Sequence, residues 1–421
     1  MHLDKYLKIL VEQHKRFVAM CEEFPRHPSS NAKDGLVRRV VRVITPGTLI
    51  DESFLNPYEN NYLLAISSSA SNGPLGLAWI DVSTGEFFSN SSSYESFRDE
   101  LARISPREIV LEKDLENDPS HPVRKALAED GNFVSYAISS DAELLAPATP
   151  PSDDLVDTPR ITFEPCETSA VKLLTAFLRA NLLEGMPALS SPSKEMSDGR
   201  MQIDSHTIKA LEIRESMIEG GTAGSLLSVI KRTQTTGGTR LLARWLCKSL
   251  LLILGRYQPS LSGSPSTSIK EINARQSLVS FLWARPHLRE DLAAYLSDVE
   301  DVSRIVQRFI LGRGEPSDLA SIHSSISIWG MVKARLQMEQ RRELQENDED
   351  VQCDWASVNT LLSKMTDLSQ LSGRIASALP LSDDQARAVN TDAQDLAVES
   401  PDASRSGVWR WGSNKWTIRP E

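Results

Sequence analysis

The 421-residue sequence contains no Gly-Lys pair, and therefore no G-x-x-x-x-G-K-[ST] loop of the kind that wraps the phosphates of ATP. Its four cysteines form no C-x-x-C pair, and its seven histidines show neither H-x-x-x-H nor H-E-x-x-H spacing. These absences exclude the common signatures of P-loop ATPases and zinc sites. Cysteines scattered in this way (Cys21, Cys166, Cys247 and Cys353) predict buried thiols in a reducing compartment. We therefore expect no catalytic residue, cofactor or metal in this chain.

Long apolar runs and positive charge are also scarce. No apolar run approaches the roughly 20 residues that span a bilayer, so no membrane contact is expected. The N-terminal segment already carries acids and lacks an apolar core, so no targeting peptide is expected. Lys and Arg number 46 against 57 Asp and Glu, which gives a net charge of −11. This balance counts against an autonomous, tight nucleic-acid binder, although not against a chain whose DNA-contacting part lies elsewhere.

The first half of the chain alternates between strand and helix patterns. Leu3, Tyr6, Leu7 and Leu10 have helical spacing, and residues 16–21 have the density of a buried strand. Residues 37–49 alternate and then stop at the turn dipeptide Pro46–Gly47. Residues 61–113 predict three strands, with a turn at Thr84–Gly85, then a helix over 95–104 and a strand over 108–112. The Pro- and Asp-rich residues 139–165 predict a linker.

From Cys166 onward the patterns are helical. Asp204 is expected to cap a helix, because its carboxylate can accept hydrogen bonds from the first free amides. One further helix is expected to carry a single apolar stripe from Leu288 to Phe309. The alternating end of the chain, with Trp409, Trp411 and Trp416, predicts a hairpin that turns at residues 412–414. Its tryptophans either pack across the strands or stack on nucleic-acid bases, and cross-strand packing is favoured.

The most informative stretch is residues 225–246, SLLSVIKRTQTTGGTRLLARWL. Apolar and small residues recur there at three- or four-residue steps, which predicts one continuous amphipathic helix. Gly237 and Gly238 are costly inside a helix unless another backbone comes close, so a helix crossing is expected at this pair. The basic residues fall mostly outside the apolar face and are expected to stay solvated; they are Lys231, Arg232, Arg240 and Arg244.

Asp81 raises the alternative of a nuclease, because it is an acidic residue that lies on a predicted strand. A two-metal nuclease needs several carboxylates that converge on ions about 4 Å apart, and Glu86 and Glu112 are the candidates. The simpler interpretation is that Asp81 and Ser83 shape the turn between two strands. Isolated carboxylates are weak evidence for catalysis, so the turn is favoured.

Residues 225–246 resemble the core, or lever, domain of the MutS family of DNA mismatch-repair ATPases, and three further segments resemble other parts of that family. The segment before Thr48 is similar to the end of the mismatch-binding domain, residues 76–87 to the connector domain, and residues 201–213 to a core helix. The residues that carry the resemblance and belong to the family signature include Thr45, Pro46, Gly47, Asp81, Gly85, Asp204, Leu226, Leu227, Thr233, Gly238, Arg240, Leu241 and Trp245.

The resemblance implies a multidomain α/β plus all-α protein, in which an RNase H-like connector domain precedes a helical lever domain. It places the remnant of the mismatch-binding domain at 1–52, the connector at 53–160, the core or lever at 161–405 and the start of the clamp at 406–421. Residues 248–263 interrupt the family pattern and are expected to be an insertion, of the kind that an unspliced intron would give. Ser303 stands where members of the family usually have Glu.

The function that the resemblance implies is DNA mismatch repair, with mismatched double-stranded DNA and a second MutS homologue as partners of the full-length protein. ATP and Mg²⁺ belong to the full-length family. The Phe-x-Glu mismatch reader of the family is absent from this sequence. We therefore expect a shortened, non-catalytic polypeptide that serves as a mechanical lever. It is most similar to a fungal mitochondrial MutS homologue, so a mitochondrial parent is expected, with the nucleus as the alternative. An RNase H-like nuclease and a helical interaction protein without a DNA role remain the other interpretations.

Overall fold

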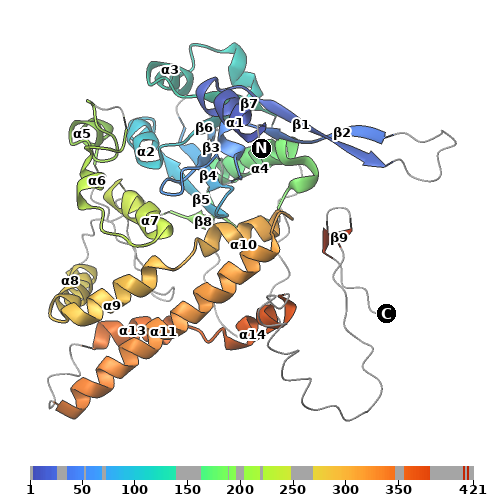
Figure 1. Cartoon of the computed structure of the whole chain (residues 1–421). Helices are drawn as coiled ribbons and strands as arrows, with labels where there is room; N and C mark the ends of the chain where they lie inside the picture. Colours follow the sequence, from blue (N-terminus) through green and yellow to red (C-terminus); the bar gives the residue numbers. More distant parts are fainter. Residues whose placement is uncertain are drawn as a thin grey trace, which may run out of the picture.

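The computed structural model describes residues 3–25, 36–51, 54–68, 73–138, 163–187, 189–195, 203–218, 221–247, 269–346 and 355–379, and two short strands at 411–412 and 415–416. Figure 1 shows a sheet flanked by helices in the upper half and a group of helices, α8 to α14, in the lower half. The predicted combination of an α/β part with a helical part is confirmed at this level. Within the described residues, the structure holds no helix that is both long and apolar enough to cross a bilayer.

The N-terminal part is a helix followed by a projecting hairpin. Helix α1 (Leu3–Lys8) continues into a π turn (Ile9–Gln13), and β1 (Val18–Pro25) pairs antiparallel with β2 (Leu36–Ile44). The predicted helix and strands are confirmed. The expected burial of the first strand is wrong, because the described side chains of β1 are exposed or half-buried in a hairpin that extends away from the body (Figure 1). Cys21 is consequently exposed, whereas Cys166 is buried as predicted.

Six strands form the central sheet. They are β3 (Tyr62–Ser68), β4 (Leu75–Asp81), β5 (Glu86–Ser92), β6 (Glu108–Glu112), β7 (Val134–Ala137) and β8 (Ser193–Lys194). Their order is β7-β6-β3-β4-β5-β8. Strand β4 runs antiparallel to both of its neighbours, β3 and β5, whereas β6 is parallel to β3, β7 to β6 and β8 to β5. The strands, the turn and the helix predicted over 61–113 are therefore confirmed.

Helices cover both faces of this sheet. Successive side chains of its strands point to opposite faces, and the side chains on both faces are apolar. Leu63 and Ala65 belong to the core that includes α4 (Pro165–Leu182), whereas Leu64 and Ile66 belong to the core that includes α2 (Phe97–Ile104) and α3 (Pro122–Glu129). Two 3₁₀ turns, η3 (Lys113–Asn117) and η4 (Leu183–Gly185), follow β6 and α4. Helix α4, which the predicted boundary at 160 assigns to the helical domain, thus packs on the sheet.

The N-terminal end of α4 approaches the backbone of β4 very closely. A Cβ built on Gly76 would lie 1.9 Å from the carbonyl oxygen of Cys166, so only glycine fits at this position of the strand. The domain boundaries themselves stay predictions.

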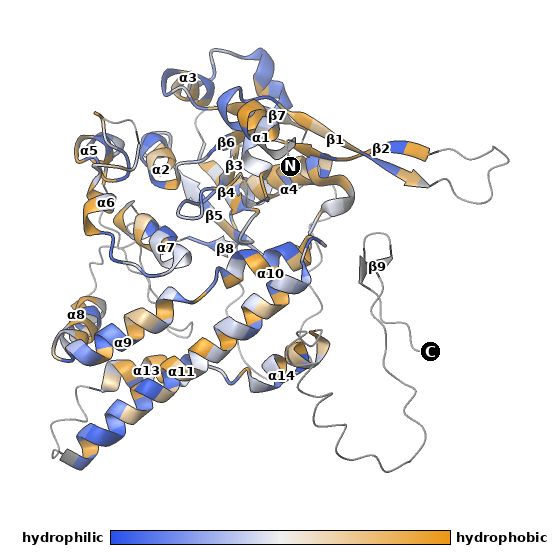
Figure 2. Cartoon of the chain, viewed as in Figure 1, coloured by the Kyte–Doolittle hydropathy of each residue, from blue (hydrophilic) through white to orange (hydrophobic). Residues whose placement is uncertain are grey.

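The remaining helices form the second part of the molecule. They are α5 (Ser205–Ala210), α6 (Leu226–Ile230), α7 (Thr236–Cys247), α8 (Ile269–Trp283), α9 (Pro286–Ser297), α10 (Val302–Ile310), α11 (Pro316–Glu346), α13 (Ala356–Lys364) and α14 (Ser369–Ala378). Phe281 of α8, Leu288 of α9 and Val332 of α11 pack around the buried Trp355. Hydrophobic and hydrophilic residues alternate along the long α11 (Figure 2), so only part of its surface contributes to this core.

Two helix predictions are wrong in the same way. Residues 225–246 are not one helix, because the chain leaves the helical path between α6 and α7. The stripe from Leu288 to Phe309 is likewise divided between α9 and α10. In both cases a polar side chain caps the second helix, and the apolar spacing continues across the break.

Some predictions concern residues outside those that the structure describes. Most of the linker at 139–165, the insertion at 248–263 and the tryptophan side chains of the last hairpin belong to this group. The backbone of that hairpin is described: β9 (Trp411–Gly412) pairs antiparallel with β10 (Lys415–Trp416), with Trp411 opposite Trp416. This pairing agrees with the turn expected at residues 412–414.

Candidate functional site

The carboxylate of Asp81 organises the turn between β4 and β5. Its side chain is fully buried, and Oδ1 accepts hydrogen bonds from the Ser83 amide at 2.9 Å and the Ser83 hydroxyl at 2.6 Å. Oδ2 accepts a third hydrogen bond from the Asn61 amide at 3.1 Å. These bonds support the turn interpretation, because they occupy both oxygens with donors from the protein.

The other carboxylates of the nuclease hypothesis do not join Asp81. Glu86 forms an ion pair with Arg244, and Glu112 accepts a hydrogen bond from the Ser67 hydroxyl at 3.0 Å. Across the described part of the chain, no group of three or more His, Cys, Asp or Glu side chains could hold a metal ion. The structure gives the nuclease hypothesis no support.

A second buried carboxylate, Glu108 of β6, fastens the Thr45–Thr48 turn to the sheet. Its Oε2 accepts from the Thr45 hydroxyl at 2.5 Å and the Gly47 amide at 2.8 Å, and its Oε1 accepts from the Ser135 hydroxyl at 2.5 Å. A Cβ on Gly47 would lie 2.6 Å from a methyl group of Leu63. The signature residues Thr45, Pro46 and Gly47 are therefore buried together, and they join the N-terminal hairpin to the sheet.

Burial raises the pKa of Glu108, although the three hydrogen bonds act in the opposite direction. Desolvation exceeds the hydrogen bonds because the carboxyl group is closed off from water and its three donors are neutral groups. Sequence reasoning missed this residue, since a single Glu in a strand gives no signal of its partners.

The glycine pair of the signature segment lies at the start of α7, not at a helix crossing. The Gly238 amide donates to the Thr235 hydroxyl at 3.0 Å, so Thr235 caps the helix, and the hydroxyls of Thr233 and Thr239 lie 2.7 Å apart. A Cβ on Gly238 would lie 2.8 Å from that Thr235 hydroxyl. The predicted crossing is wrong: the close neighbours of Gly238 are the cap residues themselves.

Arg240 of α7 is buried, contrary to the expectation that it stays solvated. Its side chain is 7% exposed and binds Asp301 with two hydrogen bonds, from Nη1 at 2.6 Å and Nη2 at 3.0 Å. Nη1 also donates to the carbonyl oxygen of Pro57 at 2.7 Å. Arg240 thus joins α7, the start of α10 and the loop before β3.

Asp301 is the centre of this arrangement. Besides Arg240, the Thr236 hydroxyl donates to Oδ2 at 3.1 Å, and the Arg304 amide at the start of α10 approaches Oδ1 at 3.5 Å. Burial alone would raise the pKa of Asp301, but the hydrogen bonds and charge of Arg240, with the charge of Arg304, outweigh it and lower the pKa. The carboxylate therefore stays ionised between two buried arginines.

Arg304 extends the connection to the loop that precedes β3. Its Nη2 donates to the carbonyl oxygens of Asn56 at 3.3 Å and Glu59 at 2.9 Å. The guanidinium is 3% exposed, and its Nε lies 3.9 Å from Asp301. We call Arg240, Asp301 and Arg304, with the backbone of residues 56–59, the arginine junction.

Two further contacts join the helices to the sheet beside the arginine junction. Arg244 of α7 donates from Nη1 to both oxygens of Glu86 at 3.0 Å. Gly85 has a φ of 75°, and a Cβ there would lie 2.7 Å from Oε1 of Gln307 in α10. The turn between β4 and β5 therefore lies directly against α7 and α10.

The other signature residues lie apart from the junction or contribute little to it. Asp204 caps α5 as predicted, by accepting from the Thr207 amide at 3.2 Å. Leu227 is buried, whereas Leu226 is 40% exposed, and Leu241 and Trp245 are half-buried on α7. Sequence reasoning did not assign roles to Asp301 and Arg304; the available signal was the Asp-x-x-Arg spacing across a helix start.

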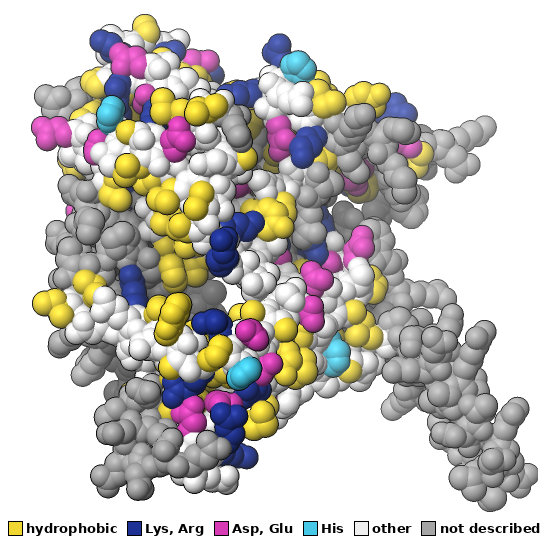
Figure 3. Space-filling view, turned by 60° about the vertical axis from the view of Figure 1, so that its left-hand side comes forward, with side chains coloured by type: hydrophobic (Ala, Val, Ile, Leu, Met, Phe, Trp, Pro, Cys, Tyr) yellow, Lys and Arg dark blue, Asp and Glu magenta, His cyan; other side chains and the backbone are white. Residues whose placement is uncertain are grey.

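Hydrophobic side chains remain exposed around α5 and α6. Met217, Ile218 and Val229 are 75%, 91% and 64% exposed. Figure 3, which brings this side of the molecule forward, shows hydrophobic side chains next to small groups of Lys and Arg. Single exposed apolar residues are common on proteins, so this surface alone does not identify a partner.

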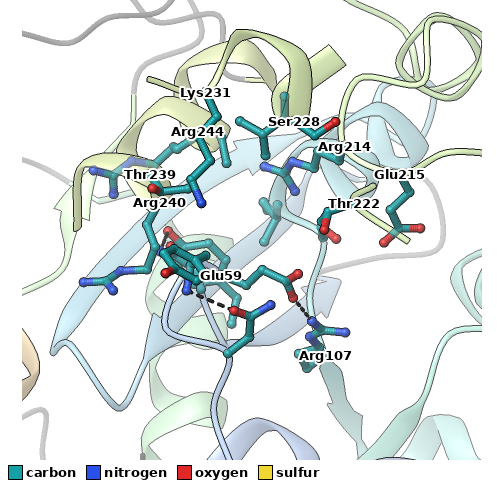
Figure 4. Close-up of a pocket in the computed structure, with 18 of the residues that line it drawn as sticks. Glu59, Arg107, Arg214, Glu215, Thr222, Ser228, Lys231, Thr239, Arg240 and Arg244 are labelled. Carbon is teal, nitrogen blue, oxygen red and sulfur yellow. Dashed lines mark hydrogen bonds and ion pairs between the residues drawn. The ribbon is translucent and has the colours of Figure 1, made fainter. Parts of the chain in front are cut away.

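A cavity of about 310 Å³ opens beside the arginine junction (Figure 4). Its wall is formed by the loop before β3, the end of α2, the loop before α6, and α6 and α7. Five basic side chains and two acidic ones line it: Arg107, Arg214, Lys231, Arg240, Arg244, Glu59 and Glu215.

Comparisons with known proteins agree with the arrangement of segments along the chain. Three family models match: MutS domain I over residues 1–53, MutS domain II over 61–148 and MutS domain III over 206–397. Proteins named DNA mismatch repair protein MutS are similar to most of the chain. That of Rhodopseudomonas palustris (strain BisB18) is 34% identical over 344 residues, 79% of this chain and 35% of the relative.

Two more relatives carry the same name. The protein of Rhodopseudomonas palustris (strain HaA2) is 32% identical over 406 residues, which cover 90% of this chain and 39% of the relative. That of Rhizobium meliloti (strain 1021) is 31% identical over 352 residues, which cover 79% of this chain and 35% of the relative. The chain thus spans little more than a third of the length of the curated relatives that it matches.

Proposed function

Because the chain belongs to the MutS family, we propose that it is a non-catalytic coupling segment of a DNA mismatch-repair protein. In this role it holds the N-terminal hairpin, the sheet and the helices in one mechanical unit. A change at one end is then carried to the other through packed elements instead of through a reaction at this chain's own residues.

The arginine junction is the observation that carries this proposal. Three parts of the chain that lie far apart in sequence, residues 56–59, α7 and α10, are joined there by charged hydrogen bonds among buried groups. Loss of one partner from a buried ion pair strongly destabilises the folded protein. The joined elements therefore either shift together or the junction breaks. A junction of this kind couples the three parts of the chain, as the proposed role requires.

We further propose that the sheet has an RNase H-like topology. The support is its order β5-β4-β3-β6-β7, with an antiparallel group of three strands followed by two parallel strands. The catalytic use of such a sheet is not proposed, since both oxygens of Asp81 accept hydrogen bonds within the protein. Fold alone does not carry a function from one protein to another.

The partners follow from the same proposal. Mismatched double-stranded DNA and a second MutS homologue would bind through the whole mismatch-repair protein, and ATP with Mg²⁺ would act at residues other than these 421. The parent protein is proposed to work in mitochondria, with the nucleus as the alternative. A fluorescent fusion of the native gene would distinguish the two compartments.

Distance measurement between spin labels tests the mechanical part of the proposal. One label replaces the exposed Arg38 on β2, and a second replaces Met338 on α11, which is 57% exposed. A single coupled unit predicts one narrow distance distribution. It is expected to broaden in Asp301→Asn, because Arg240 and Arg304 lose the charged carboxylate that they share. A broad distribution in the unsubstituted chain would contradict the proposal.

The repair role is tested separately in the source organism. Deletion of the coding sequence is expected to raise the rate of base-substitution and frameshift mutation in the compartment where the protein works. An unchanged rate in both mitochondrial and nuclear DNA would favour the helical interaction protein without a DNA role.

A further inference from the structure

The cavity beside the arginine junction has an excess of positive charge in a protein that is acidic as a whole. Five basic and two acidic side chains line it, whereas the whole chain has a net charge of −11. Its volume, about 310 Å³, lies at the lower end of the range for small-molecule sites. When the ion pairs of Arg107, Arg240 and Arg244 are set aside, Lys231 and Arg214 still outnumber the one remaining acidic side chain, Glu215, and this positive excess favours an anion.

Three of the five basic side chains are already neutralised. Arg240 is paired with Asp301, Arg244 with Glu86 and Arg107 with Glu59. Their carboxylate partners hold them in place, so they form a fixed wall. Figure 4 shows Arg107 and Glu59 joined on one side of the cavity.

Lys231 and Arg214 differ from those three. Neither has a carboxylate within ion-pair distance among the described residues. The ammonium group of Lys231 lies 3.7 Å from the centre of the Tyr58 ring, which orients it without neutralising it. Arg214 donates from Nη2 to the carbonyl oxygen of Arg103 at 3.0 Å, while its buried Nε has no hydrogen-bond partner in the described part of the chain.

A buried donor without a partner is costly, and a basic side chain without a counter-ion attracts anions. The hydroxyl group of Thr222 lines the same cavity as these two cations (Figure 4), whereas that of Ser228, which also lines it, already donates to the carbonyl oxygen of Ser225 at 2.7 Å. Guanidinium, ammonium and hydroxyl donors around one hollow match the oxygens of a phosphate group, which accepts several hydrogen bonds at once.

We propose that this cavity binds a small phosphate-bearing molecule, with Lys231 and Arg214 as its principal cationic contacts. Because the cavity wall includes the loop before β3 as well as α6 and α7, a bound ligand would also tie the sheet to the signature segment. Binding at this cavity does not depend on the proposed mismatch-repair role.

Calorimetric titration of the whole chain with pyrophosphate, at constant ionic strength set by chloride, tests the site. We expect one saturable site, weakened at least about tenfold by Lys231→Gln or Arg214→Gln, since each removes a charge-assisted hydrogen bond. Lys125→Gln on α3 is the matched control, because it removes the same charge from an exposed position outside the cavity. Lys231→Arg is expected to retain binding.

Other ligands separate the sources of the phosphate group. Tighter binding of ADP than of pyrophosphate supports a nucleotide as the ligand, and equal binding supports pyrophosphate itself. Circular dichroism of each variant checks its fold, and Lys231→Gln carries the test if Arg214→Gln does not fold. The proposal is overturned if pyrophosphate does not saturate, if Lys125→Gln weakens it equally, or if only duplex DNA depends on the two residues.

Discussion

Replacing Asp301 by Ala is the sharpest perturbation of the arginine junction. The substitution leaves Arg240 and Arg304, which are 7% and 3% exposed, without their shared carboxylate. Removing one partner of a buried ion pair costs about 3–5 kcal/mol, because the remaining charge is left in a poorly solvated place. That is a large part of the about 5–15 kcal/mol by which folded proteins are stable.

Urea unfolding followed by circular dichroism measures this loss as a change in the free energy of unfolding. Asp301→Asn provides a milder variant, because its amide oxygen still accepts hydrogen bonds, and a loss of about 1.5–3 kcal/mol is expected for the charge-assisted part. Asp291→Ala is the control, since Asp291 pairs with Arg335 but is 47% exposed, and its loss is expected to cost about 1 kcal/mol or less.

The pH dependence gives the same prediction a second readout. The pKa of Asp301 is lowered in the folded protein, so its contribution to stability is present above its unfolded pKa, about 3.9, and is lost as pH falls through the folded pKa. The stability difference between the unsubstituted chain and Asp301→Asn should therefore shrink at acidic pH. If Asp301→Ala costs no more than Asp291→Ala, the reasoning about the buried junction is refuted.

Three further predictions concern the sheet. Gly76→Ala places a Cβ against the Cys166 carbonyl and is expected to lower the free energy of unfolding by at least about 3 kcal/mol. The control, Gly185→Ala, meets open space and should change this free energy little. Equal effects of the two substitutions in thermal unfolding would contradict the close approach of α4. Because the pKa of Glu108 is raised in the folded protein, the free energy of unfolding should decrease as pH rises through that pKa. Glu108→Gln should remove this dependence on pH in urea unfolding. An unchanged dependence would contradict the assignment to Glu108. Asp81→Asn should lower stability without changing any Mg²⁺-dependent DNA cleavage, and loss of a cleavage activity would instead support the nuclease.

The strands were predictable because their signal is local. The short apolar runs from Tyr62 to Ser68 and from Leu75 to Asp81, with a Thr-Gly turn after the second, indicate neighbouring strands that pair. The parallel addition of β6 is also local, since it follows one helix. By contrast, β8 pairs with β5 across about a hundred residues of sequence, and a two-residue strand is too short to carry a pattern that predicts this pairing.

The broken helices were missed because apolar spacing continues across a break when both helices pack on the same side. The signals were present but weaker: Thr235 stands three residues before Gly238, and Asp301 stands three before Arg304. The burial of Arg240 could not be predicted, because its partners Asp301 and Pro57 lie 61 and 183 positions away. A charged residue on a helix is usually solvated unless a distant partner neutralises it.

Hydrogen exchange of the native protein, read segment by segment, tests the central claim that the arginine junction couples the sheet to the helices. In Asp301→Asn, we predict faster exchange together in three places: the Asn61 amide and the turn after β4, the first turns of α7, and α10. Exchange in β1 and β2, which lie outside the junction, should change little. Faster exchange confined to α10, with the sheet and α7 unaffected, would contradict the account.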